Sequence, residues 1–209
     1  MNAGRDTAPV VVIGAGCIGA AIAYHLGLRG VKDVVVLERE LFSGAGSTGK
    51  CAGGIRQQFS SKVNVRICQE SVRQYERFSE EMGTGEVFWQ VGYLFLLSDP
   101  AQWIAYQQQA EFQRSLGVPT EMLTPEQVAE RWPVVSVDGV LGGTFCGTDG
   151  LGDPHMITQA YEARARALGA KFRFGETARS LRMQGSRVVG VVTDKGEIDT
   201  PMVVNAAGA

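Results

Sequence analysis

The chain has 209 residues, with 20 Lys and Arg against 22 Asp and Glu, which gives a formal net charge of −2. A chain this close to neutral has no electrostatic reason to bind DNA or RNA, and an apolar fraction of 44% is too high for wholesale disorder. Four cysteines without a C-x-x-C pair favour a reduced compartment, so we expect a cytoplasmic protein. The two histidines have no Cys or His at metal-ligand spacing, so we expect no metal site.

The first 40 residues follow a strand–helix–strand pattern. In chain order, the predicted elements are a loose tail over 1–8, a strand over Val10–Ile13, a helix over Cys17–Leu28 and a second strand over Val34–Leu37. Ile18, Ile22 and Leu26 form the predicted apolar stripe of the helix. Such a βαβ unit predicts a parallel sheet. The uncharged segment 7–28 is long enough to cross a membrane, but Pro9 and three glycines interrupt it, so we expect no membrane span.

Beyond residue 40, turn residues separate shorter elements. We predict a loop over 42–54, helices over 62–82 and 102–116, a strand or strand pair over 88–97, short strands over 134–147 with turns at 138–139 and 142–143, a helix over 153–168, and strands at 171–174, 187–193 and 202–204. The apolar stripe of the 62–82 helix is predicted to consist of Val63, Ile67, Val72, Tyr75 and Phe78. Thr124 and Gln127 fit a capping box that begins another helix.

A glycine motif, Gly-Ala-Gly-Cys-Ile-Gly, lies over residues 14–19 between the first strand and the helix. Gly14 permits a tight turn, Gly16 lets the backbone approach a pyrophosphate, and Gly19 lets the helix pack on the strand. Cys17 and Ile18 belong to the first helical turn, whose N–H groups attract phosphate. The alternative is a glycine-rich turn that binds nothing. Because the motif follows a strand and opens a helix, we predict a dinucleotide site.

An acidic residue at the end of the second strand supports this site. Glu38 lies about 20 residues after the glycines, where a carboxylate accepts hydrogen bonds from ribose hydroxyls. A free 2′-hydroxyl is therefore favoured, and NADP is disfavoured. Arg39 is included among the cofactor-binding candidates, although strand alternation points it to the other side, where it would be a solvated charge. The glycine motif alone leaves FAD and NAD open.

A second glycine- and serine-rich segment, GSTGKCAGGIRQQF at residues 46–59, supplies further N–H donors after the second strand. Here the sequence resembles the D-amino-acid-oxidase-like (DAO) family of flavoproteins, the group with glycine oxidase, sarcosine oxidase and dimethylglycine dehydrogenase. The other matching segments are VVVIGAGCIGAAIAYHL, VVVLERE, GLGDPHMITQAYEARARALGAKFRFG and VVGVVTDKGEIDTPMVVNAAGA. Residues 85–147 match only loosely.

The resemblance implies an α/β fold, in which an FAD-binding Rossmann-like βαβ domain joins a partial antiparallel-sheet substrate domain. It assigns the pyrophosphate to Gly14, Gly16 and Gly19 and the adenosine ribose to Glu38. The flavin side would contact Ser47, Thr48, Lys50, Cys51, Ala52, Gly53 and Gly54, and the remaining cofactor contacts would be Ala178, Ala207 and Gly208. Some relatives bind flavin covalently through a histidine two residues after the Ser-Thr pair. Because Lys50 stands there, the resemblance implies non-covalent FAD.

The resemblance also implies an activity, the oxidation of a C–N bond in a small amine or amino acid such as sarcosine, proline or a D-amino acid. A hydride would pass from the carbon next to the amine nitrogen to flavin N5, and water would hydrolyse the imine. Arg56 matches a position at which relatives bind the substrate carboxylate, a task that suits a guanidinium. The alternative role of Arg56 is a surface or interdomain salt bridge. Trp89, Tyr93 and Phe95 are expected to be core residues rather than pocket lining.

The predicted domains are residues 1–84 for FAD, 85–148 for part of the substrate domain and 149–209 for the rest of the FAD domain. The chain stops at Gly208-Ala209, directly after an apolar strand, so we expect the N-terminal part of a longer protein. We therefore expect weak FAD binding and poor turnover from this chain without a partner subunit or C-terminal half. The competing functions are an NAD-dependent Rossmann dehydrogenase and a non-catalytic flavin-binding assembly or scaffold protein.

Overall fold

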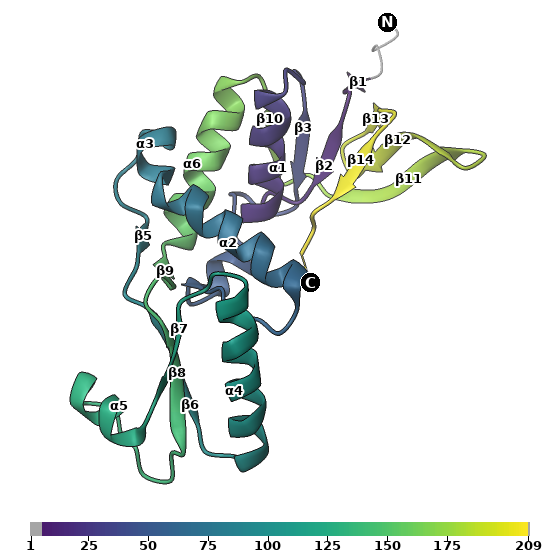
Figure 1. The fold of residues 1–209 in the computed structure, drawn as a ribbon. Helices are drawn as coiled ribbons and strands as arrows, with labels where there is room; N and C mark the ends of the chain where they lie inside the picture. The colour runs from purple at the N-terminus through teal and green to yellow at the C-terminus, as the bar shows by residue number, and fades with distance from the viewer. Residues whose placement is uncertain (1–5, 209) are drawn as a thin grey trace, which may run out of the picture. The chain divides into compact units, whose positions relative to one another are not determined.

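The computed structural model describes residues 6–208, which form two compact units (Figure 1). The first unit contains the chain up to Cys51 and from Asp153 onward, drawn in purple and in green to yellow. The second unit is Ala52–Gly152, drawn mostly in blue and teal. Within the described residues, no helix has the length and apolar character needed to cross a membrane.

A parallel sheet forms the centre of the first unit. Its strands, in spatial order, are β10 (Lys171–Phe174), β3 (Val35–Glu38), β2 (Val11–Ile13) and β14 (Val203–Asn205). Val11, Val12, Val35 and Val36 are at most 1% exposed, as the continuous apolar runs predicted. The predicted parallel βαβ unit is therefore confirmed.

Two helices pack against each other in this unit, α1 (Cys17–Leu28) and α6 (Pro154–Ala167). Both were predicted, but the predicted apolar stripe of α1 is partly wrong: Ile18 is 67% exposed, whereas Ile22 and Leu26 are half-buried. The buried residues are instead Gly19, Ala20, Ala23 and Tyr24. Three of these four are small residues, which let the helix backbone approach its neighbours, and the fourth, Tyr24, packs its ring against Tyr161 of α6.

The first unit also contains a second sheet, with strand order β1 (Asp6–Thr7), β13 (Glu197–Asp199), β12 (Arg187–Thr193) and β11 (Ala178–Gln184). The predicted loose tail is wrong for residues 6 and 7, which pair in parallel with β13, and residues 1–5 lie outside the described chain. β11 and β13 were not predicted from the sequence. Most of β11 is exposed, so it lacks the buried apolar pattern of a core strand and forms through its pairing with β12.

The second unit contains two antiparallel sheets, as predicted for this region. One has the order β4 (Gly54–Ile55), β9 (Gly150–Gly152) and β5 (Phe88–Trp89), and the other β6 (Tyr93–Leu97), β8 (Gly142–Cys146) and β7 (Thr120–Leu123). The predicted turn at 142–143 is wrong, because both glycines lie inside β8. A Cβ on Gly142 would meet the Trp103 ring at 2.5 Å, so tight packing explains this glycine.

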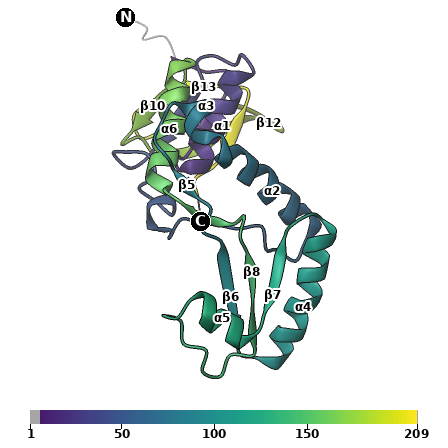
Figure 2. The same cartoon turned by 60° about the vertical axis from the view of Figure 1, so that its left-hand side comes forward.

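The helices of the second unit are α2 (Lys62–Glu76), α3 (Phe78–Met82), α4 (Pro100–Ser115) and α5 (Pro125–Arg131). Figure 2 shows α4 beside β7. The capping box of Thr124 and Gln127 is confirmed at the start of α5. The single helix predicted over 62–82 is two helices, and its stripe is partly wrong, since Val63 and Ile67 are 67% and 59% exposed.

The compact units and the predicted domains divide the chain at different residues. The predicted first domain ends at residue 84, whereas the first unit ends at Cys51 and resumes at Asp153. Residues 52–84 group with the second unit because α2 contributes to its core, where Val65, Val118 and Cys146 form a buried cluster. Each unit therefore has a core of its own.

Candidate functional site

The glycine motif connects β2 to α1 in the first unit, and two of its glycines are required by close backbone contacts. Gly14 has a φ of +102°, and a Cβ there would lie 2.3 Å from the Ala206 carbonyl oxygen. A Cβ on Gly19 would lie 1.9 Å from the Gly14 carbonyl oxygen. Neither position accepts a side chain unless the backbone moves. The packing role predicted for Gly19 agrees with this geometry.

Gly16 differs from the other two glycines because a Cβ there would meet only Thr48 Oγ1, at 3.1 Å. Gly16 is the N-cap residue of α1 and has no side chain to cap the helix. The Cys17 N–H donates to Thr48 Oγ1 over 3.1 Å, and Ile18 next to it is exposed. The space beside Gly16 and the start of α1 form an environment that attracts an anion such as a phosphate.

The loop over residues 43–50 packs against this motif. The Gly44 N–H donates to the Ala15 carbonyl over 3.0 Å, and the Gly49 N–H donates to the Gly44 carbonyl over 2.8 Å. These bonds hold Ser47 and Thr48 beside the start of α1. Lys50 and Cys51 follow at the end of a short 3₁₀ turn (η1, Thr48–Lys50), and both are exposed. Ser47 and Thr48, two of the predicted contacts, therefore lie beside the glycine motif.

Glu38 ends β3, and its carboxylate bonds to two backbone N–H groups, at Ala15 over 2.8 Å and at Glu40 over 3.0 Å. A pocket of about 170 Å³ lies beside it. The pocket is lined by Ile13, Gly14, Leu37, Glu38, Arg39, Glu176, Thr177, Ala178 and Ala207. Arg39 lies just after the end of β3 and lines this pocket, while its side chain is 72% exposed and forms an ion pair with Glu40 over 3.3 Å, as expected of a solvated charge.

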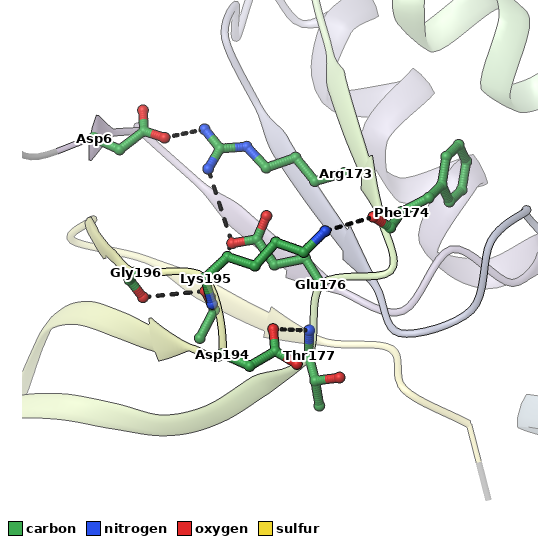
Figure 3. Close-up of polar contacts among 9 residues, drawn as sticks. Asp6, Arg173, Phe174, Glu176, Thr177, Asp194, Lys195 and Gly196 are labelled. Carbon is green, nitrogen blue, oxygen red and sulfur yellow. Dashed lines mark hydrogen bonds and ion pairs between the residues drawn. The ribbon is translucent and has the colours of Figure 1, made fainter.

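Glu176 and Thr177 form a wall of this pocket that the sequence analysis missed. Glu176 is 7% exposed and accepts from the Thr193 hydroxyl over 2.8 Å, with Arg173 at 4.0 Å (Figure 3). The Thr177 N–H donates to Asp194 over 2.9 Å, which holds the pKa of Asp194 below its usual value. Glu176 and Thr177 lie in a short turn, separated from the end of β10 by Gly175 alone. Such a turn carries no sequence motif that would predict a binding site.

The end of the described chain returns to the glycine motif. The Ala206 N–H donates to the Ile13 carbonyl over 2.8 Å, and Ala207 lines the pocket. A Cβ on Gly208 would lie 3.8 Å from Ser47 Oγ. Segments from four parts of the first unit thus meet around residues 14–19.

Three predicted cofactor contacts, Ala52, Gly53 and Gly54, belong to the second unit. Gly53 has a φ of +76° and accepts from the Gly152 N–H over 2.8 Å. A Cβ on Gly54 would lie 3.0 Å from the Tyr93 ring. Packing inside the second unit therefore accounts for these two glycines, and their role toward a cofactor remains a prediction.

Arg56, the predicted carboxylate ligand, also lies in the second unit, where its guanidinium stacks on aromatic rings. The ring centroids of Phe59, Phe95 and Tyr93 lie 4.8, 5.2 and 5.9 Å from the guanidinium carbon. Within residues 6–208 no Asp or Glu forms an ion pair with Arg56, so a salt bridge does not occupy it. Tyr93 and Phe95 are half-buried, which corrects their assignment to the core.

Titratable groups around Arg56 have shifted pKa values. Burial raises the pKa of the Cys68 thiol, the charge of Asp149 adds to the rise, and Arg56 opposes it. Burial also raises the pKa of Asp149, which is 0% exposed. Asp149 was not predicted as a site residue, since a single Asp in a Thr-Asp-Gly turn carries no signal of burial.

The parallel sheet, the glycine motif and the acidic end of β3 define a dinucleotide-binding α/β protein. The chain belongs to the FAD dependent oxidoreductase (DAO) family, which matches residues 9–209. This match decides between the two cofactors that the glycine motif left open, in favour of FAD. The competing hypothesis of an NAD-dependent Rossmann dehydrogenase does not agree with this family.

Three similar proteins illustrate the family. Human mitochondrial dimethylglycine dehydrogenase is 33% identical over 98% of this chain and 23% of its own length. The mouse mitochondrial pyruvate dehydrogenase phosphatase regulatory subunit is 28% identical over 96% of this chain and 23% of its own length. The crystal structure of L-proline dehydrogenase from P. horikoshii is 38% identical, with a TM-score of 0.90 over 98% of this chain and 54% of that chain. The chain thus spans about a quarter of the length of these curated relatives.

Proposed function

We propose that this chain is the FAD-binding part of a flavoenzyme that oxidises the C–N bond of a small amino acid. The observation that carries the proposal is the joint presence of a DAO-family match and an arginine without a carboxylate partner among three aromatic rings. The first supports FAD and the second supports a carboxylate-bearing substrate.

The residues around the glycine motif fit FAD, because the space beside Gly16 would be lost to bulkier side chains. In this proposal the backbone at Gly14, Gly16 and Gly19 and the first turn of α1 hold the pyrophosphate. Glu38 and Ala178 contact the adenosine half, and Ser47, Thr48 and the Lys50–Gly54 backbone contact the flavin half. FAD, when bound, supplies a hydride acceptor for the carbon next to the amine nitrogen. The protein contributes position and electrostatic field.

The proposal includes non-covalent FAD. Lys50 stands where some relatives carry a flavin-linked histidine, and the Cys51 thiol hydrogen-bonds to the Thr48 carbonyl over 3.1 Å. Acid precipitation of the purified protein tests this point. We expect the yellow colour to remain in the supernatant; colour that stays with the precipitate would mean a covalent link.

The substrate class follows from Arg56 and from the names of two relatives. Dimethylglycine and L-proline, after which those relatives are named, are both α-amino acids with an alkylated nitrogen. A guanidinium binds a carboxylate through two parallel hydrogen bonds, and stacking on Phe59 and Phe95 limits its motion. We therefore propose N-alkylated α-amino acids, with sarcosine, proline and dimethylglycine as representatives, ahead of D-amino acids.

Flavin reduction without oxygen tests the function. The full-length protein, loaded with FAD, is mixed with sarcosine, L-proline, dimethylglycine or a D-amino acid, and the absorbance near 450 nm is followed. We expect bleaching with at least one N-alkylated amino acid and a loss of at least tenfold in its rate for Arg56→Gln. Bleaching by none of the compounds would contradict the proposal.

The alternative is a non-catalytic flavin-binding assembly or scaffold protein. The mouse relative supports it, since its name describes a regulatory subunit. That function predicts FAD binding without bleaching by any amine, and a protein partner that covers Arg56. The proposed compartment is the cytoplasm, based on the cysteine pattern, although the two curated relatives are named as mitochondrial.

A further inference from the structure

The second unit contains a buried carboxylate with no cation beside it. Asp149 is 0% exposed and accepts three hydrogen bonds: from the Gln57 N–H over 2.8 Å, from Gln57 Nε2 over 3.1 Å and from Gln58 Nε2 over 3.1 Å. Within the described part of the chain, no Lys, Arg or His forms an ion pair with it. Burying a carboxylate is costly, so amide donors must provide most of its stabilisation.

The Gln58 amide is fully used in this network. Its Nε2 donates to Asp149 Oδ2 and, over 2.9 Å, to the Tyr93 carbonyl, while its Oε1 accepts from the Thr144 hydroxyl over 2.9 Å. Gln57 Nε2 also donates to the Thr148 hydroxyl over 2.8 Å. The network therefore ties three separate segments together: residues 57–58, the start of β6, and residues 144–149, which run from the middle of β8 into the turn after it.

The network is connected to the Arg56 cluster at two points, Gln57 and Tyr93. Arg56 directly precedes Gln57, whose N–H bonds to Asp149. Tyr93, whose ring faces the guanidinium at 5.9 Å, has its carbonyl bonded to Gln58. Asp149 thus fixes the backbone that carries the arginine and, through Gln58, the strand that carries two of its rings, although it forms no ion pair with the guanidinium.

We infer that Asp149 is a positioning residue for the Arg56 carboxylate site: through Gln57 and Gln58 it holds the guanidinium and its aromatic rings in the geometry that binds the substrate carboxylate. This inference rests on the proposed function. A guanidinium binds a carboxylate through two hydrogen bonds only at a defined orientation, and an error of about 1 Å in such a site costs up to about 100-fold. Asp149 therefore controls the preference for amines that carry a carboxylate.

The test compares each amino acid with the same amine without its carboxylate. The probes are L-proline with pyrrolidine, and dimethylglycine with trimethylamine, titrated calorimetrically into the full-length protein. Asp149→Asn keeps the side-chain size but turns an amide toward Gln58 Nε2, so two donors face each other. We expect the affinity of Asp149→Asn for the amino acid to fall about tenfold, and for the simple amine by less than twofold.

A matched control separates positioning from general destabilisation. Gln69 is a buried amide in the same unit, 7% exposed, and its Nε2 donates to the Leu116 carbonyl over 3.0 Å. Gln69→Leu removes that bond and the one that Gln69 Oε1 accepts from Arg66 over 3.1 Å, without touching the Asp149 network. We expect it to lower the melting temperature, as Asp149→Asn does, but to leave the affinity ratio of amino acid to amine unchanged.

The outcomes distinguish the two proposals. If Arg56→Gln leaves the preference for the amino acid unchanged, or if the wild-type protein binds neither amino acid, the proposed function fails and the inference fails with it. If Arg56→Gln abolishes the preference but Asp149→Asn behaves like Gln69→Leu, the inference alone is overturned. A tenfold loss confined to the amino acids in Asp149→Asn supports it.

Discussion

The glycine motif of the first unit and the Arg56 cluster of the second are built by different means. Around Gly14 and Gly19 the backbone itself makes the contacts, and a single Cβ would lie within 2.3 Å of a carbonyl oxygen. Around Arg56 side chains make the contacts, with aromatic rings from two segments and a buried carboxylate 92 residues after Gln57. The glycine motif therefore depends on the absence of side-chain atoms, and the Arg56 cluster depends on the rings and polar groups that its side chains provide.

This difference determines how each region responds to substitution. A backbone-built site tolerates no added atoms at its glycines, whichever side chain supplies them. A site built from side chains tolerates changes in size more easily but loses function when one hydrogen-bond partner changes chemistry. Variants that add atoms should therefore be most harmful at the glycine motif of the first unit. Variants that change only polarity should be most harmful around Arg56 in the second unit.

The largest effect is expected from Gly14→Ala. The added Cβ would lie 2.3 Å from the Ala206 carbonyl oxygen, and the φ of +102° is unfavourable for alanine. Strain and overpacking together should lower the free energy of unfolding by roughly 3 kcal/mol or more and abolish measurable FAD binding. Urea unfolding and flavin fluorescence titration measure the two effects.

Two other glycines of the first unit serve as controls for Gly14→Ala. Gly30 has a φ of +82° and open space around its Cβ position, so Gly30→Ala should cost only the backbone term of about 1 kcal/mol. Gly46 has open space and no positive φ, so Gly46→Ala should change stability by less than about 0.5 kcal/mol. Equal losses in all three variants would disprove the role of the Ala206 contact.

The next prediction concerns the pH dependence of stability, which should differ between a carboxylate of the second unit and one of the first. Burial raises the pKa of Asp149 above its ordinary value of 3.8, so the stability that its protonated form contributes is present below pH 3.8 and is lost as the pH rises through the folded-state pKa. Asp149→Asn lacks this titration. We therefore expect its destabilisation, about 1–3 kcal/mol at pH 4, to become smaller at pH 7 in urea unfolding.

Asp194 of the first unit should show the reverse trend. The Thr177 N–H lowers its pKa below 3.8, so its contribution is present above pH 3.8 and is lost as the pH falls through the folded-state pKa. The cost of Asp194→Asn should therefore grow from about pH 2 to about pH 5 and change little above that. The same trend in both variants would show that the two carboxylates do not differ as their surroundings indicate.

The same contrast explains how much the sequence could predict. The glycine motif, Glu38 and the loop at 46–50 lie in short segments whose spacing reflects backbone geometry, so the elements β2, α1 and β3 and their junction were predicted. The buried face of α1 was not, because its large aliphatic residues follow a helical period while the face that packs is made of three small residues and Tyr24. Periodicity indicates where a helix lies but not which face approaches a neighbour most closely.

Contacts between distant segments left no pattern to recognise. Glu176 and Asp149 each follow a glycine turn or form part of one, where carboxylates are common and usually solvated. Their burial depends on partners such as Thr193 and Gln58, which only the folded chain brings near. The strand β11 was missed for a related reason, because its pairing with β12 compensates for a weak apolar pattern.

The smallest effect compares a helix cap in each unit. Thr48 accepts from the Cys17 N–H at the start of α1, and Thr124 accepts from the Gln127 N–H at the start of α5. Thr48→Val and Thr124→Val should each lower the free energy of unfolding by about 1 kcal/mol, because each leaves a helical N–H without its acceptor. Only Thr48→Val should also weaken FAD binding, since Thr48 lies beside Gly16 and Thr124 belongs to the other unit. An equal loss of FAD affinity in both variants would mean that stability, rather than the local geometry of the glycine motif, controls binding.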